Sequence, residues 1–301
     1  MIFFLFSFIL LVCTITTLQK KHYNKDLLDR LNGVAVPSLS VPARPVIVYP
    51  LNKRYRGLEK LGRNPPAILM GVRLVNGPDK RRNSAYELRG KPYSYIKIPN
   101  AGRMDTRKAM TILIWAFPKN RIGPIVQFGN QGFAVRLWMM RRNMVFAEFV
   151  TRQSRKKKPY LASIDGVQPW KWNHFGMSYD KTTGTATLYV NSKPVVRKQI
   201  GSFDLSTNHD VYLGARPGDK QYFRGRVSCL QFFDRALSSH QVKQMEKKCF
   251  RFSGNLPNKL VQNTALFFKN PTKLMDLAVS HMRVTKRLAF VLVSSPTLLT
   301  S

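Results

Sequence analysis

The sequence predicts an all-β sandwich that ends in one short helix. Between residues 66 and 250, short runs rich in β-branched and aromatic residues alternate with polar turns, which is the pattern of sandwich strands. Several of these runs alternate apolar and polar side chains, as strands with one buried face do. The run 111–117 is apolar on both faces, as a central strand covered on both sides would be.

Turn residues bound the expected strands. Residues 141–143 separate two runs as the turn of a hairpin. In the run 172–180, Phe175, Met177 and Tyr179 share one face and are expected in the core. The expected strands, in order, are 93–98, 111–117, 123–128, 133–140, 144–150, 172–180, 185–190, 211–215 and 226–233.

The predicted helix follows the last strand. Ser238 is placed to cap its N-terminus, and Gln241 occupies the capping-box position three residues later. Val242, Met245 and Cys249 then recur on one face at helical spacing, so this face is expected to pack on the sheet.

Positive charge is the unusual feature of the composition. The chain has 50 Lys and Arg against 15 Asp and Glu, and its formal net charge of +35 is spread along the sequence. Such a surface attracts polyanions, so the candidate partners are sulfated glycans, nucleic acid, anionic lipid and acidic proteins or minerals. Hydrophobic residues make up 44% of the chain, which argues against wholesale disorder.

The first segment predicts export. Residues 2–18 are uncharged and mostly apolar, so residues 1–18 are predicted to be a signal peptide and the protein to be secreted and extracellular. An uncleaved anchor is the alternative, but the run is at the short limit for a span and the basic residues after it would retain the main domain in the cytosol. No stable membrane span is therefore expected.

Composition divides the rest of the chain into three parts. Residues 19–65 are rich in Lys, Arg and Pro and predict a basic linker, with a short helix at 23–31. Residues 66–250 form the sandwich. Residues 251–301 are less patterned and predict a basic C-terminal tail.

Three cysteines fit the prediction of export. Cleavage of the signal peptide would remove Cys13 and leave Cys229 and Cys249, which we expect to form a disulfide that pins the helix to the sheet. Closing that loop would stabilise the fold by roughly 3 kcal/mol. Two free buried thiols are the alternative if the chain stays in the cytosol.

Two segments carry a resemblance to a known family. Residues 170–195 contain Trp172, His174 and the run 188–191, and residues 222–245 contain a strand followed by the predicted helix. These motifs, in this order, resemble the laminin G-like domains of the concanavalin A-like lectin/glucanase superfamily. The resemblance extends over nearly all of residues 66–250 and implies a jelly-roll sandwich of two antiparallel sheets.

The chain departs from this family at one turn and in its carboxylates. The family often has glycine where this chain has Ser192, and we expect this change to affect turn geometry only. Family members often bind calcium on one rim, but Asp180, Asp204, Asp210 and Asp219 are scattered, whereas Ca²⁺ takes about 6–8 oxygen ligands. No metal or cofactor is therefore predicted, and a calcium site remains only as an alternative.

No catalytic constellation is found in the sequence. Hydrolases of this superfamily carry paired carboxylates on one strand, but Glu148 is the only carboxylate in the run 144–150. Neither a Gly-x-Ser-x-Gly elbow nor a His-Glu-x-x-His motif occurs. His174 is expected to be structural, as its family counterpart is. The sequence thus predicts a binding module that is not an enzyme.

Basic turns form the predicted binding site. Residues 152–158 place five cations in seven residues, a pattern typical of heparin-like or nucleic-acid patches. In an up-and-down succession, Lys119, Arg121 and the turn 141–142 share one rim, and 152–158 lie at the other. A solvated loop without a partner is the alternative. The predicted polyanion-binding residues are Arg141, Arg142, Arg152, Arg155, Lys156, Lys157 and Lys158.

The function predicted from the sequence is a secreted, heparin-type binding module for sulfated glycans or other extracellular polyanions. There are two alternatives. The protein is a structural component of an extracellular or mineralised matrix, or it is a cell-adhesion protein that binds a receptor. Nucleic acid is not expected, because of the signal peptide and because the Tyr and Phe residues are placed at core-facing strand positions rather than at exposed stacking sites.

Overall fold

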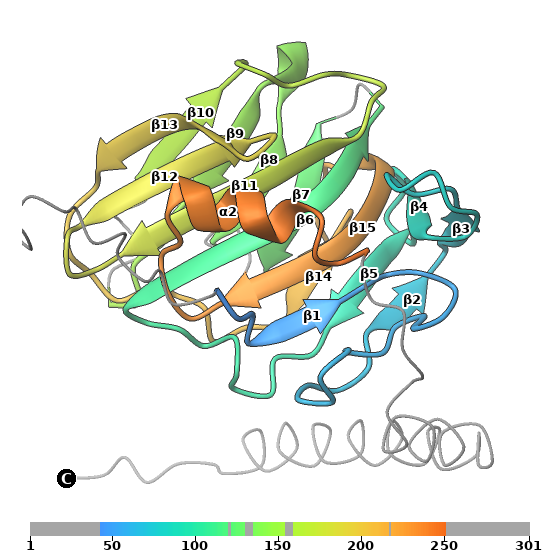
Figure 1. Cartoon of the computed structure of the whole chain (residues 1–301), viewed down its shortest axis with the longest axis horizontal. Coiled ribbons are helices and arrows are strands. Elements are labelled where there is room, and N and C mark those ends of the chain that lie inside the picture. The colour runs from blue at the N-terminus through green and yellow to red at the C-terminus, as the bar shows by residue number, and fades with distance from the viewer. Residues whose placement is uncertain (1–42, 120–121, 130–134, 154–158, 217, 251–301) are drawn as a thin grey trace, which may run out of the picture. The chain divides into compact units, whose positions relative to one another are not determined.

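The computed structural model describes residues 43–119, 122–129, 135–153, 159–216 and 218–250 (Figure 1). The predicted signal peptide, the helix at 23–31 and the C-terminal tail lie outside the described residues. The described part confirms the predicted all-β sandwich, the jelly-roll arrangement of two antiparallel sheets, and the single short helix.

One sheet has eight strands and the other has seven. The eight-stranded sheet runs in the order β13 (Lys193–Gln199), β12 (Thr185–Val190), β11 (Asn173–Asp180), β6 (Ala109–Pro118), β15 (Arg224–Phe233), β4 (Ala85–Arg89) and β3 (Arg73–Val75), and β1 (Ile47–Tyr49) also pairs with β15. The seven-stranded sheet runs in the order β10 (Tyr160–Ser163), β9 (Val145–Glu148), β8 (Arg136–Met139), β7 (Gly123–Phe128), β14 (Val211–Leu213), β5 (Tyr95–Ile98) and β2 (Ile68–Met70).

The core lies between the two sheets. Phe175, Met177 and Tyr179 are fully buried there, as the alternation along 172–180 predicts. From the other sheet, Leu137 on β8 and Val145 on β9 join the same cluster. Full burial of one large apolar side chain stabilises a fold by about 1.5–3 kcal/mol, so this shared cluster holds the sheets together.

A helix covers the outer face of the eight-stranded sheet. Helix α2 (Ser239–Glu246) begins with the predicted capping box, because the Ser238 side chain accepts from the backbone N–H of Gln241 and the Gln241 side chain accepts in return. Figure 1 shows α2 lying across β11 and β6. Trp115 on β6 donates from Nε1 to the carbonyl of Glu246 at 3.0 Å. Strand β6 is therefore covered on both faces, as its apolar run predicts.

A disulfide joins this helix region to the sheet. Cys229 on β15 is bonded to Cys249, with their Cα atoms 5.9 Å apart. Both cysteines are buried in a small cluster with Val48, against which Trp115 and Phe250 pack. The disulfide therefore lies on the outer side of the eight-stranded sheet, beyond the C-terminal end of α2.

The sandwich begins earlier than the sequence predicts, so the expectation of a linker over 19–65 is wrong from Val46 onward. Strand β1 pairs with β15 in the register Val48 opposite Gln231. Leu51 and Tyr55 are buried, and the Glu59 carboxylate accepts from the backbone N–H of Val48 at 2.8 Å. Because this segment is rich in Pro, Lys and Arg, its composition does not reveal the three-residue strand and the packed loop that it forms.

Candidate functional site

Each strand of the seven-stranded sheet contributes one side chain to a continuous row on the outer face of the sheet. The strand register aligns these residues, and alternation places them opposite the core-facing Leu137, Val145 and Leu161. The α-helix of the described residues lies on the other sheet. We call this set the outer row, and its members are Tyr160, Glu148, Arg136, Gln127, Tyr212, Lys97 and Ile68.

One half of the outer row combines aromatic rings with an ion pair. Arg136 Nε lies 2.8 Å from Glu148 Oε2, and the guanidinium carbon of Arg136 lies 4.7 Å from the ring centre of Trp138. Next to this pair, the rings of Phe146 and Tyr160 are stacked with their centres 5.3 Å apart. Tyr160 is 57% exposed, so it presents an open ring face beside a fixed guanidinium.

The other half repeats this combination. Lys97 Nζ lies 2.9 Å from Asp210 Oδ2 and 5.9 Å from the ring centre of Tyr212. The Tyr95 ring lies 6.0 Å from the Tyr212 ring. Because Asp210 accepts a hydrogen bond from Lys97, the pKa of the Lys97 ammonium is raised above its usual value. Lys97 therefore stays charged beside two tyrosines.

A buried amide connects the two halves. Gln127 Nε2 donates to Asp219 Oδ2 at 2.6 Å, and Arg216 Nη2 lies 2.7 Å from Asp219 Oδ1. Tyr222 donates from its hydroxyl to the carbonyl of Asp219. The middle of the outer row is thus held in place by several hydrogen bonds.

Such a surface is suited to recognising sugars. Flat aromatic rings offer apolar faces on which ring C–H groups can pack, and the adjacent guanidinium, carboxylate and amide groups can hydrogen-bond hydroxyls. The Tyr and Phe residues are expected from the sequence at core-facing positions, and for Tyr160, Tyr212, Tyr95 and Phe146 this expectation is wrong. The signal is present in the alternation of 136–139, where Leu137 and Met139 face the core and Arg136 and Trp138 face away from it.

The predicted basic turns separate in the structure. Arg141 and Arg142 are exposed in the 3-10 turn η1 (Arg141–Asn143) between β8 and β9. Gly123, at the start of β7, lies opposite Met139, so the β6–β7 connection lies at this same end of the sheet. Within that connection, Lys119 Nζ is bound to Glu87 Oε1 at 2.6 Å and is 15% exposed, while Arg121 lies outside the described residues.

Arg152 lies at the opposite end of β9 and is held by the protein itself. It forms an ion pair with Asp105, its Nε donates to the carbonyl of Leu205 at 3.3 Å, and its side chain is 22% exposed. The other four predicted residues, Arg155, Lys156, Lys157 and Lys158, lie outside the described residues. Arg141 and Arg142 are therefore the predicted site residues that the structure places together and exposed.

His174 belongs to a buried structural network. It lies on β11 with its Nδ1 3.0 Å from Ser192 Oγ and its ring 5.2 Å from that of Trp115. Burial lowers the pKa of His174 to about 3, so the imidazole is neutral at physiological pH. Ser192 Oγ also donates to Glu246 Oε2 at 3.0 Å. The expectation that Ser192 affects turn geometry only is therefore wrong.

The aspartates considered for calcium each have a cation or a backbone partner of their own. Asp204 is bound to Lys181, Asp210 to Lys97 and Asp219 to Arg216, while Asp180 accepts from the backbone N–H of Thr182. Among the described residues, no group of three His, Cys, Asp or Glu side chains is arranged to hold a metal ion.

The described residues also include no helix that is long and apolar enough to cross a membrane.

Comparison with known sequences identifies one family. The sequence model described as the concanavalin A-like lectin/glucanases superfamily matches residues 89–243, about half of the chain. This segment contains most strands of both sheets and nearly all of the outer row. No curated protein matches the chain.

Several solved structures share the fold. The botulinum neurotoxin serotype G binding domain has a TM-score of 0.53 and 15% identity, and the match covers 67% of this chain and 50% of that one. The binding domain of Paraclostridial Mosquitocidal Protein 1 has a TM-score of 0.53 and 18% identity, over 68% of this chain and 52% of that one. The botulinum neurotoxin serotype D ligand binding domain in complex with N-acetylneuraminic acid has a TM-score of 0.55 and 12% identity, over 69% and 52%.

The chain spans about half the length of these toxin domains. At such identities the similarity shows the fold alone.

Proposed function

The chain belongs to the concanavalin A-like lectin/glucanase superfamily, and we propose that it is a non-catalytic glycan-binding module that uses the outer face of its seven-stranded sheet. The observation that carries this proposal is the exposed Tyr160 ring, stacked on Phe146 and adjacent to the Arg136–Glu148 ion pair. This arrangement offers an apolar wall and a fixed set of hydrogen-bonding groups within one surface.

The outer face itself is balanced in charge. Its cations Arg136, Lys97 and Arg216 are each paired with a carboxylate. We therefore assign this face the recognition of sugar rings and hydroxyls, which depends little on salt. A preference for acidic glycans comes from the net charge of +35 and from the exposed rim cations Arg141 and Arg142.

Acidic glycans outside the cell are the proposed ligands. The predicted signal peptide supports an extracellular location, as does the disulfide between Cys229 and Cys249, since disulfides persist in oxidising compartments. The serotype D toxin domain, which shares the fold, is in complex with N-acetylneuraminic acid, itself an acidic sugar. Within the proposal, sulfated glycans such as heparin are the leading class.

A glycan array with variants of Tyr160 tests the proposed face. We expect Tyr160→Ala to weaken binding of the best glycan by about two- to twelvefold, because one aromatic stacking contact of about 0.5–1.5 kcal/mol is lost. Tyr160→Phe is the matched control, since it keeps the ring and should retain most of the affinity. Unchanged binding of Tyr160→Ala would contradict the proposal.

Glycan binding measured over a series of salt concentrations separates the contribution of the rim cations from that of the outer face. The double variant Arg141→Gln/Arg142→Gln should bind acidic glycans more weakly at low salt and should flatten the salt dependence. The double variant Arg197→Gln/Lys198→Gln removes the same charge from exposed positions on β13 and serves as its control. If single-stranded DNA binds with equal affinity and the same dependence on Tyr160, the ligand class is nucleic acid instead.

A further inference from the structure

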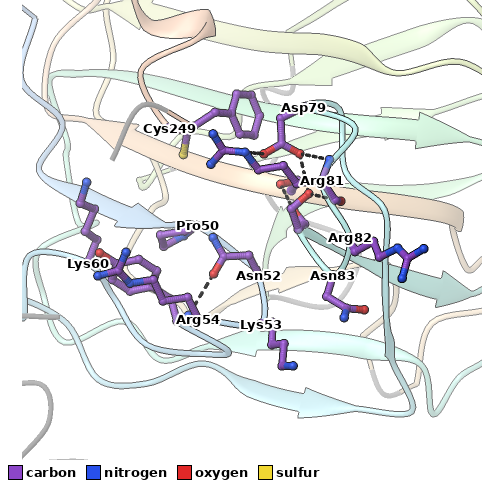
Figure 2. A pocket seen from close by; sticks show the side chains of 14 residues that line it. Pro50, Asn52, Lys53, Arg54, Lys60, Asp79, Arg81, Arg82, Asn83 and Cys249 are labelled. Atoms are coloured by element: carbon purple, nitrogen blue, oxygen red, sulfur yellow. Dashed lines mark hydrogen bonds and ion pairs between the residues drawn. The ribbon is translucent and has the colours of Figure 1, made fainter. Parts of the chain in front are cut away.

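A second site lies on the other side of the sandwich. A cavity of about 440 Å³ opens between the loop 50–60 after β1 and the turn 79–84 between β3 and β4 (Figure 2). Cys249 and Phe250 also belong to its lining. Strands β1, β4 and β15 around it belong to the eight-stranded sheet. We call this cavity the basic pocket; it is separate from the outer row.

Cations dominate the lining of the basic pocket. Figure 2 shows Arg54 and Lys60 on one side and Arg81 and Arg82 on the other, and Lys53 is also part of the lining. Against these five cations stands one carboxylate, that of Asp79.

The Asp79 carboxylate is already engaged by its own turn. Its Oδ1 accepts from the Ser84 hydroxyl at 2.5 Å and from the backbone N–H of Arg81 at 3.1 Å, and its Oδ2 lies 3.7 Å from Arg81 Nε. Asp79 therefore shapes the turn and compensates one cation at most. The pocket keeps a strong positive excess.

The clustering of these cations affects the pKa of Lys60. Burial and the nearby charge of Arg54 lower the pKa of the Lys60 ammonium to about 8. A bound anion would relieve this repulsion, because an opposite charge favours the charged form.

The walls of the basic pocket are preorganised. The backbone N–H of Lys53 donates to the carbonyl of Asn83 at 2.8 Å and so joins the loop to the turn. Asn83 in the lining has a φ of 57°, and Leu51 and Cys229, each next to a lining residue, have φ values of 54° and 50°, a left-handed conformation that is costly for leucine and cysteine. Such local strain is concentrated at functional sites more often than elsewhere.

We propose that the basic pocket binds a sulfated sugar residue and is a second glycan subsite of this protein. The inference rests on the proposed function for the class of ligand, but it concerns different residues. A cavity of this size exceeds a single ion, and its cations lie on both sides, so it suits several anionic groups carried on one small ring. Asn52 and Asn83 add amide groups that can bond sugar hydroxyls.

Binding of a defined sulfated oligosaccharide to the full chain tests this proposal. The double variant Lys53→Gln/Arg54→Gln changes two exposed side chains and should weaken that binding at least tenfold. The double variant Arg197→Gln/Lys198→Gln removes equal charge from β13 and should change it less than twofold. Equal losses in both double variants would overturn the pocket in favour of diffuse charge attraction.

Two further ligands test whether the basic pocket recognises a sulfated sugar. The desulfated oligosaccharide should lose the contribution of Lys53 and Arg54, so that the wild type and the double variant bind it alike. A phosphoserine peptide should bind more weakly than the sulfated oligosaccharide. If the peptide binds more tightly and depends on the same two residues, the assignment to a sulfated sugar is wrong.

The outer row provides the comparison with the proposed function. If Tyr160→Ala weakens glycan binding while Lys53→Gln/Arg54→Gln does not, the proposed function stands and the basic pocket is refuted. If sulfate-dependent binding requires Lys53 and Arg54 but not Tyr160, the pocket stands and the outer row is refuted as the glycan site.

Discussion

The hydroxyl of Ser192 lies 3.0 Å from Nδ1 of His174, deep beneath the C-terminal end of α2. The same hydroxyl reaches Oε2 of Glu246, the last residue of that helix, also at 3.0 Å. One small side chain thereby joins the β12–β13 turn, strand β11 and the helix. These two contacts explain why the chain has serine at a position where members of the family often have glycine.

The first prediction concerns the replacement Ser192→Gly. Ser192 has a φ of 64°, so glycine would relieve backbone strain there. It would also remove both hydrogen bonds and leave buried polar groups without them, at a cost of about 1–3 kcal/mol. We expect a net loss of roughly 1 kcal/mol in the free energy of unfolding, measured by urea denaturation.

Ser192→Ala is the control for this change, because it removes the hydroxyl but keeps the strain. It should be less stable than Ser192→Gly. A Ser192→Ala protein at least as stable as the wild type would show that the network with His174 and Glu246 contributes nothing.

The second prediction is an acid sensitivity that originates at His174. Burial lowers the pKa of His174 in the folded protein to about 3, from an ordinary value of 6.5. The unfolded chain therefore binds one more proton in this window, and stability decreases as pH falls from about 6.5 towards 3. Between pH 7 and pH 5 we expect a loss of about 2 kcal/mol in the free energy of unfolding.

His174→Gln separates this effect from that of the carboxylates. Glutamine can keep a hydrogen bond to Ser192 but does not titrate, so the variant should lose much less stability between pH 7 and pH 5. The carboxylates act at lower pH. Burial raises the pKa of Glu87, but the hydrogen bonds from Lys119 and Arg73 together outweigh it and lower that pKa, and the hydrogen bond from Lys181 lowers the pKa of Asp204. Identical pH profiles for wild type and variant would refute the role of His174.

The third prediction concerns Arg136, which has two roles. It is paired with Glu148, whose side chain is 8% exposed, so Arg136→Ala should destabilise the fold by about 3–5 kcal/mol. Arg136→Lys keeps the charge and loses the planar guanidinium beside Trp138. We expect Arg136→Lys to retain most of the stability but to weaken glycan binding severalfold, measured by urea denaturation and by titration calorimetry.

How far the sequence predicts the fold depends on the burial of each strand. Strands β6 and β11 are central, and their apolar runs identify them. Strand β13 lies at a sheet edge with mostly exposed Lys, Arg and Gln, so neither alternation nor hydrophobicity reveals it. Strand β1 has three residues within a Pro-rich and basic segment, and its pairing with β15 is a long-range event that no local pattern encodes.

The candidate sites differ in the same way. The turn with Arg141 and Arg142 is visible as a cluster along the chain. The outer row joins four consecutive strands, β7 to β10, to β14, β5 and β2 from distant parts of the sequence, so it appears only once the strand register is known. The basic pocket likewise needs the loop 50–60 beside the turn 79–84. Charge density alone predicts that Arg152 and Lys119 are available to a ligand, but the folded protein uses both for its own ion pairs.

The last prediction concerns the disulfide between Cys229 and Cys249, which are separated by 20 residues in sequence. Cross-linking a loop of this size stabilises a fold by about 3 kcal/mol on the chain-entropy model. For a domain of this size that corresponds to a fall of roughly 6–12 °C in Tm for the double variant Cys229→Ala/Cys249→Ala, measured by calorimetry. Because Cys249 lines the basic pocket, the same variant should also bind the sulfated oligosaccharide more weakly.

Hydrogen exchange distinguishes a local from a general effect. Exchange should accelerate most in α2, at Val242 and Met245, because the disulfide anchors the end of this helix to β15. The buried strand β6 should be less affected, since it is held from both sides. If the purified wild type instead carries both thiols free and matches the double variant in Tm, the alternative of two free buried cysteines holds, and the disulfide no longer supports export.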